Sequence, residues 1–438
     1  MTAQTTTVWT LEKCIEHALK NNLGIQQAQL QAQSGRYNYL QSYLNLLPNL
    51  SAFINQDWTN GQQFSLAAFR VVNATTTTFA TGANADLTLF AGLQQVHNIL
   101  RNKQDLLAAH FDLEDLRNTT ILNVTTAFLQ LMTNRELLRI AENQLRTSQL
   151  QRDAAEKRVK AGALPETALL DLQAQVARDE AGVTNARNAF ELSKLGLRLI
   201  LQLKPDEPFE VSLPELSYEP ARTSTTGSAL QVYQTAVAVQ PSILAAQARL
   251  QSAAYSRRMA WGALLPTITL NASLYDYYTN QQKAFDTTVN EFVTIPFRTQ
   301  FRDQFRKGIG LTLTVPLLSR GQRMINIANT KIQYQIAKLQ LENRKNALLQ
   351  TIYEADAQLR AAAEAYAAAK KSYDAAAAAF AAQEKRYLSG SSSLPDYQIS
   401  RNNLAAAESE LVRQKYTYIF RKKVLDFYEG KPINLQEF

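Results

Sequence analysis

The residue types most often used in catalysis and metal binding are few and scattered along this chain. Its three histidines, His17, His97 and His110, each sit alone in a helical pattern, with no partner at metal-ligand spacing. The one cysteine, Cys14, falls on the apolar face of such a pattern and has no intrachain disulfide partner. No glycine-rich phosphate loop is present. These observations predict a protein that is not an enzyme and that needs no metal or cofactor.

The charges also exclude some functions. The chain carries 46 Lys and Arg against 38 Asp and Glu, a net charge of +8, but they are mixed at helical spacing. Because no Lys/Arg block alternates with aromatic residues, we expect no nucleic-acid partner. No apolar run reaches the length of a transmembrane helix. The start "MTAQTTTVW" shows no signal peptide and is expected to be a mature N-terminus.

Two nearly identical words point to an internal repeat. "EKRVKAG" begins at Glu156 and "EKRYLSG" begins at Glu384, and Leu-Pro and an acidic residue follow each copy. Earlier in each half a helical pattern ends at Leu-Leu-Pro, and aligning the two prolines also pairs Ile25 with Ile243. So many matches in one order predict two copies of one plan.

Each copy continues, after its Leu-Leu-Pro, with two segments that alternate apolar and polar residues, as half-buried strands do. Their length suits a tilted crossing of a bilayer. Aromatic residues near their ends resemble an interfacial girdle, namely Trp58, Phe90, Tyr275, Tyr277 and Tyr278. We expect strands at about 49–58, 82–90, 267–278 and 308–317, and long irregular loops at 59–81 and 279–307.

A very long helix follows each pair of strands, at about 93–160 and 321–388. At 1.5 Å per residue such a helix is roughly 100 Å long. In the second helix, large residues recur every seven positions from Ile352 to Tyr387, with alanines three residues later. This pattern is typical of a left-handed coiled coil in which helix axes approach closely.

The repeated words lie where these helices end. Gly162 and Gly390 are suited to terminate a helix, and Pro165 and Pro395 to begin the returning one. We therefore expect two helical hairpins with tips at about 158–166 and 386–396. The domain prediction is a first structural repeat at 1–220 and a second at 221–438, with an irregular equatorial linker at 204–227.

Four strands are too few to close a transmembrane barrel, and open strand edges are unsatisfied in lipid. The chain must therefore oligomerise, and two, three or four copies would all give a plausible number of strands. On the inner face of such a barrel we expect six polar residues that wet the lumen. They are Asn84, Asp86, Thr269, Asn271, Thr312 and Thr314.

The order of these motifs resembles the TolC-like outer-membrane efflux protein family. The segments that carry the resemblance are "TLEKCIEHALKNNLGIQQAQLQAQ…LLPNLS", "VQPSILAAQARLQSAAYS…LLPTITLNAS", the two tips and the ending "RQKYTYIFRKKVLDFYEG". The resemblance implies an α+β membrane protein of two repeats. It also implies a homotrimer, in which twelve strands form one outer-membrane β-barrel continued by a long α-helical coiled-coil barrel.

The resemblance also implies a function and partners. The chain would be a passive channel-tunnel in the outer membrane of a Gram-negative-type bacterium, with a long periplasmic portion. A periplasmic adaptor and an inner-membrane pump of the ABC, RND or MFS type would recruit it. The duct would carry small molecules in efflux, or polypeptides in type I secretion.

Two sets of tip residues follow from the same resemblance. The family meets its adaptor at the helix tips, which correspond here to Ala161, Gly162, Ala163, Leu164, Ser389, Gly390, Ser391 and Ser392. It closes its periplasmic entrance with tyrosine, arginine and acidic groups. Tyr387 matches the tyrosine, but Ser391–Ser393 replace an arginine that some members carry after the glycine. The remaining gate candidates nearby are Arg158, Glu166, Arg386 and Asp396.

Two other classes of protein share part of this pattern. A soluble coiled-coil scaffold would explain the helices and tips but leaves the four amphipathic strands unexplained. A periplasmic adaptor also contains a helical hairpin, but it has one hairpin rather than a duplicated strand-and-helix plan.

Overall fold

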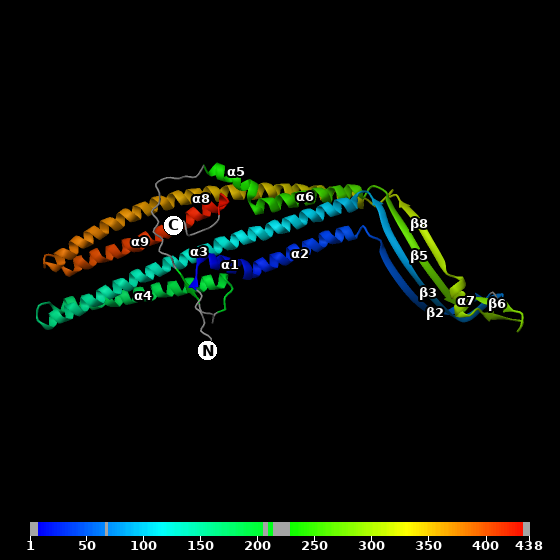
Figure 1. The fold of residues 1–438 in the computed structure, drawn as a ribbon, viewed down its shortest axis with the longest axis horizontal. Coiled ribbons are helices and arrows are strands. Elements are labelled where there is room, and N and C mark those ends of the chain that lie inside the picture. The colour runs from blue at the N-terminus through cyan, green and yellow to red at the C-terminus, as the bar shows by residue number, and fades with distance from the viewer. Residues whose placement is uncertain (1–7, 66–68, 205–208, 213–227, 432–438) are drawn as a thin grey trace. The chain divides into compact units, whose positions relative to one another are not determined.

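The structure, a computed structural model, describes residues 8–65, 69–204, 209–212 and 228–431. Long helices and one antiparallel sheet dominate it (Figure 1). The helices are α1 (Leu11–Asn21), α2 (Leu23–Leu44), α3 (Gln94–Lys160), α4 (Glu166–Ile200), α5 (Ala229–Val239), α6 (Pro241–Gly262), α7 (Phe297–Asp303), α8 (Gln322–Leu388) and α9 (Leu394–Tyr428). The strands are β1 (Val8–Trp9), β2 (Asn49–Ser65), β3 (Arg70–Ala91), β4 (Glu210–Val211), β5 (Thr267–Thr279), β6 (Lys283–Asp286), β7 (Glu291–Thr294) and β8 (Arg306–Thr314).

The chain divides into two compact units, and each unit takes segments from both sequence repeats. The first, here called the helical unit, comprises Met1–Ala32, Ala108–Ala246 and Gln340–Phe438. The second, here called the sheet unit, comprises Gln33–Leu107 and Gln247–Leu339. The two repeats at 1–220 and 221–438 are therefore not two separate compact bodies.

Local sequence signals set the helix boundaries in both repeats. The Asn22 side chain accepts hydrogen bonds from the backbone N–H groups of Gly24 (2.9 Å) and Ile25 (3.2 Å), so it ends α1 and starts α2. In the second repeat Pro241 takes the first position of α6, where its missing N–H costs no hydrogen bond.

The helical unit contains two antiparallel helical hairpins, α3 with α4 and α8 with α9 (Figure 1). A core of fully buried apolar side chains joins α1, α3, α4 and α9, with Phe128, Leu131 and Ile419 among its members. In α8 the expected heptad positions Ile352 and Tyr366 are buried, and Tyr366 stacks on Tyr418 of α9 at 6.3 Å. The alternation of large and small residues thus packs helix against helix as the sequence predicts.

The sheet unit is built on one four-stranded antiparallel sheet in the order β2-β3-β5-β8. The pairing of β2 with β3 runs without interruption from Asn49–Asp86 to Ser65–Arg70. Among the strands that the structure describes, β2 and β8 pair on one side only and form the two edges of this sheet.

The prediction of long irregular loops at 59–81 and 279–307 is wrong. Most of 59–81 continues β2 and β3, which reach 17 and 22 residues. The segment 279–307 contains the small hairpin β6–β7 and the helix α7. The alternation of apolar and polar residues ends after Trp58, which is why the sequence predicted loops. The backbone pairing of β2 with β3 nevertheless continues, because threonine, which occupies 75–78, favours strands whichever face of the sheet its side chain is on.

The equatorial linker falls mostly outside the described residues. Its described part includes β4, which pairs in parallel with β1 near the N-terminus. No helix in the described part of the chain has both the length and the apolar character needed to cross a membrane.

Candidate functional site: hairpin tips, a buried cross-hairpin network and a two-faced sheet

Both hairpin tips have the same backbone construction. Gly162 has φ +69° and Gly390 has φ +75°, the left-handed region that glycine adopts at little cost. The N–H of Ala163 donates to the carbonyl of Arg158 (2.9 Å), and that of Ser391 donates to Arg386 (2.8 Å). Together with the bonds from the two glycines, these contacts make a Schellman motif at each tip.

The tip residues are open to solvent for the most part. Six of the eight adaptor-contact candidates are exposed, and only Leu164 and Ser392 are half-buried. A Cβ added at Gly162 or Gly390 would meet nothing within 4 Å in this chain. The backbone conformation, and not lack of space, therefore calls for glycine at these two positions.

The charged gate candidates do not form the expected network within this chain. Arg158, Glu166, Arg386 and Asp396 are exposed, and none forms an ion pair in the described part of the structure. Asp396 instead lies in the first turn of α9, whose N-cap is Ser393. The Asp396 N–H donates to the Ser393 hydroxyl (3.2 Å), which in turn donates to the Asp396 carboxylate (2.6 Å).

Tyr387 is the gate candidate that makes a defined contact. Its ring stacks on the ring of Tyr397 in α9, with 4.8 Å between centroids. The Tyr397 hydroxyl accepts a hydrogen bond of 2.7 Å from the Gln151 amide in α3. Burial, and secondarily the charge of Glu384, raises the pKa of the Tyr397 phenol, which therefore stays neutral.

A buried ion pair, not foreseen from the sequence, continues this network between the two hairpins. The Arg401 guanidinium in α9 donates to the Asp179 carboxylate in α4 over 2.8 Å, and each side chain is only 6% exposed. Arg401 also donates to the Gln151 carbonyl oxygen (3.3 Å), and Gln175 donates to Asp179 (2.9 Å). Tyr387, Tyr397, Gln151, Arg401 and Asp179 thus form one connected series across the helical unit.

The sheet has a polar face and an apolar face. Residues opposite each other in the register point to the same side. Asp86 pairs with Asn271, whose amide donates to it over 3.2 Å, and Thr269 pairs with Thr312. All six residues expected in the lumen therefore lie on one face.

The opposite face is apolar and exposed. It carries Leu50, Ile54 and Trp58 on β2 and Ile309 and Leu311 on β8, which are 68–83% exposed. From Leu50 to Trp58 this stripe covers roughly 26 Å at about 3.3 Å per residue, close to the hydrocarbon thickness of a bilayer.

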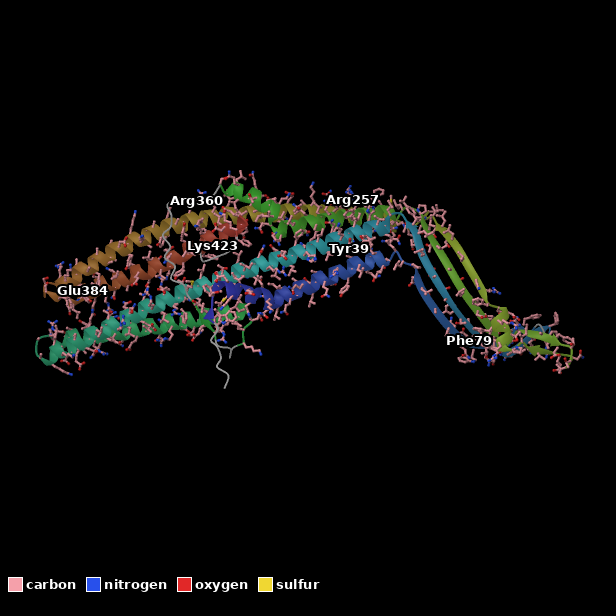
Figure 2. The ribbon with its side chains drawn as sticks, viewed as in Figure 1. Tyr39, Phe79, Arg257, Arg360, Glu384 and Lys423 are labelled. Carbon is pink, nitrogen blue, oxygen red and sulfur yellow. The ribbon has the colours of Figure 1, made fainter. Side chains whose placement is uncertain are left out.

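The expected aromatic girdle needs correction. Among the three tyrosines expected in the girdle, Tyr275 and Tyr277 share the polar face with Asn271, because they stand at even spacing from it. Only Tyr278 lies, like Trp58, with the apolar stripe. A different aromatic cluster forms on the apolar side, where Phe297 of α7 packs on Tyr278 (5.1 Å) and Phe79 (5.6 Å). Figure 2 shows Phe79 at the sheet end that carries α7.

The described residues hold no group of three or more His, Cys, Asp or Glu side chains arranged for a metal ion. Burial raises the pKa of the Cys14 thiol to about 12, so this cysteine is a packed side chain and not a nucleophile.

The comparison with protein families matches the profile of outer membrane efflux proteins at residues 14–201 and again at 232–425. The chain belongs to the outer membrane efflux protein family. BepC, the outer membrane efflux protein of Brucella suis, is 24% identical over 343 residues, which are 78% of this chain and 70% of that protein.

Solved structures of the family share the fold. A chain of CusC superposes with a TM-score of 0.79 at 18% identity, covering 96% of this chain and 92% of its own length. VceC from Vibrio cholerae gives a TM-score of 0.76 at 16% identity, with 97% of each chain covered.

Membership of the outer membrane efflux protein family decides between the three classes of protein that the sequence left open. The chain is an outer-membrane efflux channel protein with a long helical periplasmic portion, and not a soluble coiled-coil scaffold or a periplasmic adaptor. The family is one of outer-membrane transport proteins.

Proposed function

We propose that three copies of this chain form one passive exit duct across the outer membrane. The observation that carries this proposal is the four-stranded sheet with one exposed apolar face, one polar face and two edges, β2 and β8. In lipid the backbone groups of those edges need partners, and β8 of one copy pairing with β2 of the next supplies them. Three copies give twelve strands, which suffice to close a barrel.

In this assembly the polar face lines the duct. Asn84, Asp86, Thr269, Asn271, Thr312 and Thr314 wet the lumen without selecting a cargo, because they offer small neutral groups and a single carboxylate per chain. The stripe on the other face contacts lipid. The cargo is a small molecule or a secreted polypeptide, delivered by an inner-membrane pump of the ABC, RND or MFS type.

The two hairpin tips are the proposed entrance and adaptor contact. The segments 161–164 and 389–392 present exposed backbone and small side chains, which allow an adaptor to approach closely. Tyr387 and the network behind it are the proposed latch of the entrance, supported by the stack on Tyr397. Arg158, Glu166, Arg386 and Asp396 are exposed and form no ion pair within the described chain, so their charges are available to neighbouring copies.

Conductance across a planar bilayer tests the duct. The purified protein should add current in uniform steps, each step being one trimer. Protein that binds to the bilayer without adding current would refute a continuous duct. An adaptor-binding assay on tip variants tests the entrance separately, since it does not depend on conductance.

A further inference from the structure

A hollow of about 700 Å³ opens in the sheet unit beside the ends of two strands. Its walls come from α6, from the start of α8 and from the turn between β3 and α3. Figure 2 shows Arg257 in this part of α6. The backbones of Gly92 and Gly262 meet in its lining, where a Cβ on Gly262 would lie 2.2 Å from the Gly92 carbonyl oxygen. A side chain at either glycine would therefore disturb this part of the lining.

The lining carries positive charges and no acidic residue that would neutralise them. Arg257, Arg258 and Lys331 contribute to it, and no Asp or Glu does. In the described part of the chain none of these three forms an ion pair. Both guanidiniums are held by aromatic rings, Arg257 over Tyr334 at 4.9 Å and Arg258 over Tyr255 at 5.4 Å. Stacking fixes their planes and leaves their N–H groups free to bind an anion.

His97 adds a further polar group to the lining. Its ring stacks on Tyr255 at 6.1 Å, and its Nδ1 atom is buried without a hydrogen-bond partner among the described residues. Partial burial and the nearby Arg258 lower the pKa of this imidazole, which is therefore neutral at pH 7. Its ring N–H is thus a hydrogen-bond donor.

The rim of the hollow is apolar. Leu93, Trp261 and Leu265 line it and are 53%, 55% and 45% exposed. Leu93 follows β3 by two residues and Leu265 precedes β5 by two, so the rim lies where the sheet begins. Cationic groups beside exposed tryptophan and leucine at such a place are the composition of a membrane–water interface.

We propose that this hollow, here called the headgroup site, binds the phosphodiester of an anionic phospholipid from the periplasmic leaflet. Arg257, Arg258 and Lys331 contact the phosphate oxygens, and the acyl chains run along Leu93, Trp261 and Leu265. The inference rests on the proposed insertion of the sheet into the outer membrane. A free phosphate shares the anionic chemistry but would leave the apolar rim in water, so the rim favours the lipid.

Native mass spectrometry of the detergent-extracted protein tests this site with three probes. Phosphatidylglycerol should bind at up to one high-affinity copy per chain, at least tenfold more tightly than phosphatidylcholine. Inorganic phosphate in excess should displace little of it. Equal binding of the two lipids, or complete displacement by phosphate, would overturn the proposal, the latter because it would show a plain anion site.

Variants locate the binding. Arg257→Gln with Arg258→Gln should weaken phosphatidylglycerol binding at least tenfold, and the exposed Lys331→Gln alone should weaken it severalfold without touching the packed stacks. The control Arg36→Gln with Lys103→Gln removes equal charge from exposed, unpaired positions in the same unit and should change nothing. An equal loss in the control would show diffuse attraction only. Oligomer mass and conductance of the same samples test the proposed duct separately. The lipid-site proposal can therefore be refuted while the duct proposal is supported.

Discussion

The guanidinium of Arg401 donates to the carboxylate of Asp179 across the two hairpins, over 2.8 Å and with each side chain only 6% exposed. Two buried charges of this kind are costly to remove from water and depend on each other for compensation. Gln151 and Gln175 satisfy further polar atoms of the pair, and Tyr397 joins it through Gln151. The pair therefore fixes one register between α4 and α9.

Removing one partner of this pair should destabilise the protein strongly. Asp179→Ala leaves Arg401 buried without its counter-charge and should cost about 3–5 kcal/mol of unfolding free energy. The double change Asp179→Leu with Arg401→Met should recover most of that loss. Glu410→Ala, which breaks an exposed pair on α9, should cost about 0–1 kcal/mol. Circular-dichroism melts measure all three, and equal midpoints for Asp179→Ala and Glu410→Ala would contradict a fixing role.

The two faces of the sheet should respond differently to one charge. Leu311→Arg places a guanidinium on the apolar face and should cost about 2–4 kcal/mol near the bilayer centre, reducing insertion. Thr312→Arg places it on the polar face, so the protein should insert normally and its reversal potential should shift toward anion selectivity. If both variants inserted equally and neither changed selectivity, the assignment of faces would be wrong.

Substitutions of the two tip glycines should distinguish an effect on stability from an effect on adaptor binding. Gly162→Ala and Gly390→Ala impose a left-handed conformation on alanine, which costs about 1–2 kcal/mol, but they introduce no clash because the space is open. Hydrogen exchange should therefore increase at the tips while global unfolding changes little. If the tips also contact the adaptor, its affinity should fall more than the tip strain explains. Unchanged adaptor affinity would show that the two glycines only terminate their helices and do not contribute to adaptor binding.

The latch is tested by contrasting two changes at Tyr387. Tyr387→Phe keeps the stack on Tyr397 and should leave single-channel conductance near wild type. Tyr387→Ala combined with Arg386→Ser removes the stack and an exposed charge, and it should raise conductance. If the double variant conducted like the wild type, neither residue would belong to the latch.

The thiol of Cys14 should be inert in the folded protein. Its pKa is about 12 in the fold but about 8.5 in an unfolded chain, so between these values ionisation favours the unfolded state and stability falls as pH rises. At pH 8.5 a maleimide should label Cys14 only after denaturation. Ser389→Cys at the exposed tip of a Cys14→Ser protein should label at once, and rapid native labelling of Cys14 would contradict its burial.

Elements that depend on local chemistry were predictable from the sequence. Glycine and proline mark both tips, and the seven-residue recurrence marks α8, so the observed ends Lys160 and Leu388 fall where the sequence predicts them. The outer parts of β2 and β3 were missed because their threonines, asparagines and glutamines leave no apolar face to read. Those residues form strands because the backbone pairing of β2 with β3 continues as far as Ser65 and Arg70.

Contacts between distant segments were not predictable. Asp179 and Arg401 look like ordinary surface charges in helical patterns, and only the packing of α4 against α9 buries them. The same holds for Phe79 and Phe297, which meet because α7 folds back on β5. The assignment of Tyr275 to a lipid-facing girdle failed for a simpler reason, since its position in the alternation already puts it on the polar side.

The number of copies in the detergent-extracted particle tests the shared barrel most directly. Light scattering with the bound detergent subtracted should give a protein mass three times the 49.0 kDa of one chain, and removal of detergent should precipitate the protein. A monomer that stays in solution in plain buffer would contradict the account, because the exposed apolar face and the two strand edges would then have no lipid and no neighbouring copy to cover them.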